Sequence, residues 1–95
     1  MSAEKRFLFR VGRMVATPGA LEALKMAGEE ALTYIMRHQC GDWGELCEED
    51  KKSNEDAVQD GSRILSAYHL STGVKIWIIT EWDRSATTVL LPSDY

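Results

Sequence analysis

The second half of this chain contains arginine, tyrosine, serine and threonine residues of the kinds that catalyse RNA cleavage, and His38 precedes them. RNA cleavage needs a base for the 2′-hydroxyl, an acid for the leaving oxygen and a cation for the developing negative charge. Histidine, tyrosine and arginine can supply these groups, and alternate polar residues of a strand share one face. The candidate set is His38, Arg63, Ser66, Tyr68, Thr80, Arg84 and Thr88, of which His38, Arg63, Tyr68 and Arg84 would be catalytic.

The same residues also fit an ordinary strand surface, because threonine and tyrosine favour strands. Arg84 follows Asp83 in a predicted turn, where we expect a local ion pair. The net charge of −4 and the pI of about 5.1 also count against ribonuclease chemistry, since nucleic-acid binders are usually basic. We therefore expect no direct sequence-specific binding to DNA.

A second candidate site is the acidic segment 42–60, which has eight acidic residues and two lysines, a local charge of −6. A helix with acids on its outer face can mimic phosphates or dock on a basic partner, and its charge would steer association. The same pattern also fits a solvated helix that keeps the protein soluble. The candidate binding residues are Asp42, Trp43, Glu45, Glu48, Glu49, Asp50, Glu55 and Asp56.

Metal, cofactor and membrane sites are not expected from this sequence. His38, Cys40 and Cys47 lack the paired spacing and the fourth ligand of a zinc site, so we expect no metal. Two cysteines are too few for a disulfide scaffold, so we expect reduced thiols. The sequence has no phosphate-binding glycine motif or nucleophile elbow, and we expect no cofactor. It also has no signal-peptide pattern or apolar run of membrane length, and we expect a cytoplasmic protein with no membrane partner.

Three helices are predicted before the last third of the chain. Thr17-Pro18 is a helix start, since a hydroxyl caps the first turn and proline needs no partner there. Gly28 divides the following apolar pattern into helices near 18–27 and 29–38. A third, polar helix covers 48–60, with acids in its first turn and Gly61 as its stop. The loop 39–47 between the second and third helices carries Trp43, which we expect to plug into the core.

Strands are predicted at both ends of the chain, at 6–15, 62–70, 74–81 and 86–91. The last three are separated by short turns, which favours an antiparallel meander, and 74–81 is apolar on both faces and therefore central. The predicted fold is a single α+β domain over residues 1–95. An N-terminal strand and two to three helices precede a three-stranded antiparallel meander, forming one sheet with the helices on one face.

This order of elements resembles the RelE/barnase class of small ribonuclease folds. The chain also carries a distinctive string of residues: His38 with GDWG at 41–44, GxRxLSxY at 61–68, KIWIITE at 75–81, DRS at 83–85, TTxLLP at 87–92 and DY at 94–95. In this string the chain is similar to a family of short proteins borne on plasmids, prophages and other mobile elements. The resemblance implies a setting in which toxins and inhibitors of host defence are common.

Three hypotheses follow from these observations. The first is an interaction protein from a mobile element that binds and inhibits a host protein or nucleoprotein complex, in the manner of anti-CRISPR or anti-restriction proteins. The second is a RelE/barnase-like endoribonuclease that acts as a toxin. The third is a homodimeric scaffold that pairs through a sheet edge.

Overall fold

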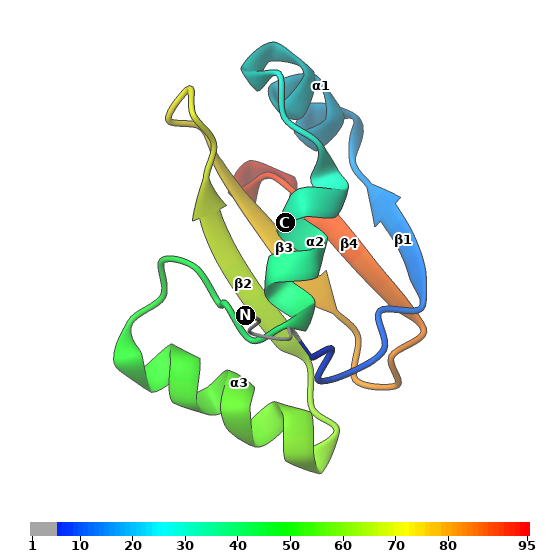
Figure 1. Ribbon diagram of the computed structural model, residues 1–95. Coiled ribbons are helices and arrows are strands. Elements are labelled where there is room, and N and C mark those ends of the chain that lie inside the picture. The colour runs from blue at the N-terminus through cyan, green and yellow to red at the C-terminus, as the bar shows by residue number, and fades with distance from the viewer. Residues whose placement is uncertain (1–5) are drawn as a thin grey trace.

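The sheet contains four strands in the order β1-β4-β3-β2 in the computed structural model, which describes residues 6–95 (Figure 1). The strands β2 (Ile64–His69), β3 (Lys75–Thr80) and β4 (Ala86–Leu90) form the predicted antiparallel meander. The strand β1 (Arg13–Ala16) pairs parallel with β4, so the sheet is mixed. The rest of the chain crosses between these two strands, as a parallel pairing requires.

The predicted N-terminal strand at 6–15 is wrong in most of its length, because β1 begins only after Gly12. The residues before Gly12 run past the end of the second helix instead. There the Leu8 N–H donates to the Gln39 carbonyl (2.8 Å), and the Gln39 amide donates to the Phe9 carbonyl (2.9 Å). The apolar alternation in this segment therefore reflects the partial burial of Phe9 and not strand pairing.

The helices α1 (Pro18–Ala27) and α2 (Ala31–Gln39) follow the predicted division at Gly28, which ends α1 with a φ of +70°. The Thr17 hydroxyl caps α1 by accepting from the Ala20 N–H (3.2 Å). Both helices pack with one face of the sheet in the main hydrophobic core (Figure 1). The fully or nearly fully buried core residues are Ala20, Leu24, Tyr34, Ile35, Tyr68, Leu70, Ile76, Ile78 and Val89.

The helix α3 (Glu48–Asp60) has the predicted bounds, but it lies beside the outer edge of β2 (Figure 1). Its few apolar residues, Ala57 and Val58, pack with Ile64 and Trp43 in a second, smaller cluster. The prediction that all helices cover one face of the sheet is therefore correct only for α1 and α2.

The outer edge of β2 is covered along two of its residues. The Asn54 side chain donates to the Leu65 carbonyl (2.6 Å) and accepts from the Leu65 N–H (3.2 Å). The Ala67 N–H donates to the Trp43 carbonyl (3.2 Å), and the Ala67 carbonyl accepts from the Glu45 N–H (2.7 Å). At the other edge of the sheet, no element within residues 6–95 pairs with the outer side of β1.

The C-terminal segment lies against the sheet and the start of α1. The short 3-10 helix η1 (Pro92–Asp94) contacts β3, and the Tyr95 ring packs edge-on against Trp77 (5.8 Å between centroids). The Thr17 hydroxyl donates to the Asp94 carboxylate (2.6 Å), which lowers the pKa of that carboxyl. The end of the chain is thus tied to the junction of β1 and α1.

Gly44 should be among the residues least tolerant of substitution. It has a φ of +78°, and an added Cβ would lie 1.9 Å from the Ala67 carbonyl oxygen. We expect Gly44→Ala to lower the free energy of unfolding by at least about 2 kcal/mol, as measured by urea denaturation. Gly61→Ala is the matched control, because Gly61 has a φ of +81° and open space around it. An equal loss of unfolding free energy in both variants would contradict a close approach between Gly44 and the Ala67 backbone.

Candidate functional site

His38 lies on the inner face of α2 and is completely buried. Its Nδ1 is 2.6 Å from the Ser66 hydroxyl on β2, and its Nε2 is 2.8 Å from the Thr80 hydroxyl on β3. The Thr80 hydroxyl lies 2.7 Å from that of Thr87, which donates to the Val11 carbonyl (2.8 Å). One chain of hydrogen bonds therefore crosses the interior from β2 to the N-terminal segment.

The protons of this chain can be assigned, because each hydroxyl has only one to donate. Thr87 uses its proton on the Val11 carbonyl, so it must accept from Thr80. Thr80 must then accept from the Nε2–H of His38, which leaves Nδ1 to accept from Ser66. With the imidazole neutral and its proton on Nε2, every donor and acceptor in this hydrogen-bond chain has a partner.

The surroundings of His38 keep it neutral. Burial, and to a lesser extent the positive charge of Arg84, lowers its pKa from 6.5 to about 3. The rings of Phe9 and Trp43 pack edge-on against the imidazole, at 5.2 and 6.0 Å between centroids. A neutral imidazole with both nitrogens bonded and no exposed surface is not placed to exchange protons with a substrate.

Arg84 is a structural link between α3 and the β3–β4 turn. Its guanidinium donates to backbone carbonyls of Ala57 (2.9 Å), Ser62 (2.6 Å), Glu81 (3.1 Å) and Trp82 (3.3 Å). The expected ion pair with Asp83 is replaced by a different contact, because that carboxylate accepts from the Ser85 N–H (3.0 Å). A hydrogen bond from the Ser85 side chain and, to a lesser extent, the one from this N–H lower the pKa of Asp83. The Arg84 donors therefore serve the fold.

The remaining candidates for ribonuclease catalysis are divided between two faces of the sheet. Tyr68 is buried, its hydroxyl donates to the Asp42 carbonyl, and burial raises its pKa. Arg63 is exposed, and its guanidinium donates to the Tyr95 hydroxyl (2.6 Å). Ser66 belongs to the His38 chain, whereas Thr88 is half-buried on the opposite face. The structure does not bring the set together at one accessible surface.

The loop 39–47 holds several of the candidate binding residues in intramolecular contacts. Trp43 is buried, as predicted, and its indole N–H donates to the Glu55 carboxylate (2.8 Å). Asp42 forms an ion pair with Arg37 (2.7 Å), and Glu45 lies 2.6 Å from the His69 imidazole. These four candidates hold the loop against α2, α3 and β2.

The other acidic residues of α3 face solvent. We define the acidic surface as Glu48, Glu49, Asp50 and Asp56, all of which are exposed. Two lysines partly neutralise the negative charge of this surface. The Lys51 ammonium lies 3.8 Å from the Glu48 carboxylate, and the Lys52 ammonium lies 3.9 Å from the Asp56 carboxylate. Three of its members occupy the first turn of α3, where they also stabilise the helix dipole. This surface is accessible to a partner.

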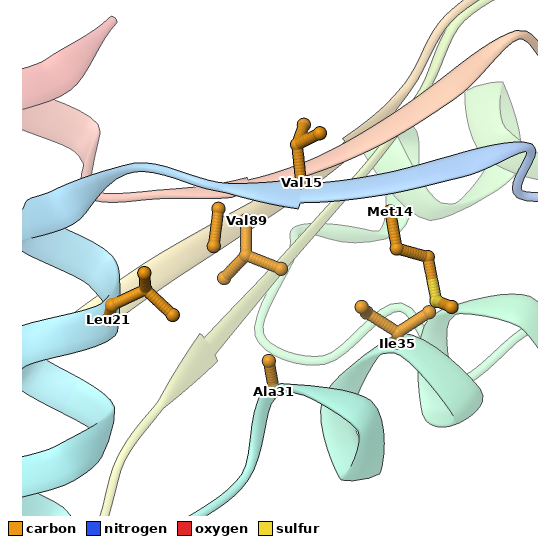
Figure 2. A pocket seen from close by; sticks show the side chains of 7 residues that line it. Met14, Val15, Leu21, Ala31, Ile35 and Val89 are labelled. Atoms are coloured by element: carbon orange, nitrogen blue, oxygen red, sulfur yellow. The ribbon is translucent and has the colours of Figure 1, made fainter.

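An apolar groove between β1 and the helices α1 and α2 was not predicted from the sequence. It has a volume of about 240 Å³ and is lined by Met14, Val15, Ala16, Leu21, Ala31, Ile35 and Val89 (Figure 2). In Figure 2 the Met14 side chain points toward Ile35, whereas Val15 points to the other side of the strand. The sequence feature that belongs to this groove is the apolar run after Gly12, which the sequence pattern assigns to the end of a longer strand.

No group of three histidine, cysteine, aspartate or glutamate side chains could hold a metal ion within residues 6–95. Cys40 and Cys47 are both free thiols. Over the same residues, no helix is long and apolar enough to cross a membrane. No family model matches the chain, and the searches of curated proteins and of solved structures found no match.

The burial of His38 predicts a pH-dependent stability. The folded pKa of about 3 lies below the ordinary value of 6.5, so between these values the unfolded chain binds a proton that the folded protein does not. The free energy of unfolding should therefore fall as the pH falls through this window, by up to about 1.4 kcal/mol per pH unit.

Urea denaturation across this pH window measures the effect. We expect His38→Gln to be less stable near neutral pH and to show a shallower slope, because glutamine does not titrate. Thr80→Val is the control, because it removes a hydrogen-bond partner of the imidazole and leaves the titrating group in place, so it should lose stability and keep the slope. The interpretation fails if His38→Gln keeps the wild-type slope.

Proposed function

We propose that this chain is a non-catalytic inhibitor, encoded by a mobile genetic element, that binds a host protein or nucleoprotein complex through the acidic surface of α3. The observation that carries the proposal is that Glu48, Glu49, Asp50 and Asp56 remain exposed. The resemblance to plasmid- and prophage-borne proteins supports the mobile-element setting. A defence complex of the CRISPR or restriction type is the concrete target.

The attachment of α3 supports this role, because the helix presents its charges from a fixed position. Asn54 joins the middle of the helix to the β2 backbone, and Glu55 holds the Trp43 indole. Arg84 binds the Ala57 carbonyl near the helix end (2.9 Å). A rigid helix loses less conformational entropy on binding than a mobile segment. Basic nucleic-acid-binding surfaces are the complementary partners for such a helix.

The arrangement of the catalytic candidates also favours binding over ribonuclease activity. His38 has no exposed surface, and the Arg84 donors are directed to backbone carbonyls. Arg63 is exposed but stands with Tyr95, away from the His38 chain. Binding through α3 requires no rearrangement of the core. Catalysis by His38, Arg63, Tyr68 and Arg84 would require one, because these residues do not meet at an accessible surface.

Charge reversal on α3 tests the proposal. A tagged wild-type chain is first used to capture its partner from the host, with bound proteins and nucleic acids both identified. We expect Glu48→Lys with Glu49→Lys to weaken binding to that partner at least about tenfold, mainly through slower association, as measured by surface plasmon resonance. The wild-type affinity should also fall as the salt concentration rises.

The matched control changes the same charge on a different surface. Glu22 on α1 and Glu30 before α2 are both exposed, so Glu22→Lys with Glu30→Lys gives the same net charge as the test variant. Equal affinity of the two variants for the partner would show that α3 is not the contact. Capture of no protein, together with cleaved RNA in the eluate, would favour the ribonuclease hypothesis.

A further inference from the structure

The outer side of β1 offers unpaired backbone groups in a defined pattern. The N–H groups of Arg13 and Thr17 donate to β4, to the carbonyls of Ser85 (2.9 Å) and Val89 (2.9 Å). Because strand residues alternate in direction, the N–H and C=O groups of Met14 and Ala16 point away from β4. Residues 6–95 supply no strand to meet them.

The surroundings of this edge are apolar. Met14 is 51% exposed, Val15 39% and Leu21 54%, and the groove of Figure 2 lies beside them. Leu32 on α2 is also exposed, and it lies one helical turn before Ile35, which lines the groove. An exposed strand edge with apolar neighbours and no proline invites pairing with another chain.

We propose that a second copy of this chain pairs with β1, antiparallel to it, around a two-fold axis at Val15. Met14 of each copy then lies opposite Ala16 of the other, and the two residues exchange backbone hydrogen bonds. In this register both outward-facing residues of Arg13–Ala16, Met14 and Ala16, pair with residues of the same strand in the other copy. The two Val15 side chains meet at the axis, as an isologous interface requires.

Charge complementarity favours a second copy as the occupant. In this register Arg13 lies opposite Thr17 of the other copy, whose hydroxyl donates to the Asp94 carboxylate (2.6 Å). Arg13, Val15 and Thr17 share one face of the strand, so each Arg13 guanidinium lies within reach of an Asp94 carboxylate across the interface. Arg13 has no ion pair within residues 6–95. The two Arg13 side chains lie at opposite ends of the paired strands.

The mass of the full chain in solution tests the proposal. Sedimentation equilibrium should give a dimer of the 10.7 kDa chain for the wild type. We expect Val15→Lys to give a folded monomer, because two lysines would face each other at the axis. Val74→Lys is the matched control, since Val74 is also 39% exposed but lies in the β2–β3 turn, and it should remain dimeric.

Two further measurements examine the register. Amide hydrogen exchange at Met14 and Ala16 should be slow in the wild type and fast in Val15→Lys. Arg13→Asp should raise the dimer dissociation constant roughly five- to thirtyfold, through loss of two symmetric ion pairs. A wild type that stays monomeric at its highest soluble concentration overturns the proposal. A dimer that survives Val15→Lys also overturns it, because the interface must then lie elsewhere.

Discussion

The buried hydrogen-bond chain through His38 is the constraint that organises this small protein. It joins α2 to β2 and β3, and through Thr80 and Thr87 it reaches β4 and the segment before β1. A buried polar chain stabilises a fold only when every member is paired, since one unpaired group would cost its full desolvation. The imidazole therefore fixes the position of α2 over the sheet and, with it, one wall of the apolar groove.

A second set of contacts depends on that arrangement and belongs to the loop 39–47. Once α2 is fixed, Trp43 packs against His38 and Phe9, and its indole N–H meets Glu55 on α3. Gly44 then approaches the Ala67 backbone closely. Trp43 and Gly44 of the distinctive GDWG run are accounted for by these packing requirements. A domain of this size has a small core, and these loop residues are needed to complete it. The exposed surfaces are therefore the part of the molecule available for function.

Local signals in the sequence were enough to predict the helices and the meander. Thr17-Pro18, Gly28 and Gly61 act within a few residues of their own positions, and the bounds of α1 and α3 follow from them. The pairing of β1 with β4 and the partners of His38 depend on residues 28 to more than 70 positions apart. No local pattern encodes such pairings. Four of the residues assigned to binding, Asp42, Trp43, Glu45 and Glu55, are held in intramolecular contacts that no local pattern indicates.

The two edges of the sheet differ in a way that limits how far strand pairing can extend. Asn54 and residues 43–45 occupy the backbone groups of Leu65 and Ala67 that a further strand would need. Growth of the sheet by successive addition of chains, as in an amyloid fibril, requires both edges to be open. The Asn54 side chain makes the hydrogen bonds that a neighbouring strand would make at Leu65. It therefore blocks the addition of a further strand at β2 and limits the number of chains that can join through the sheet.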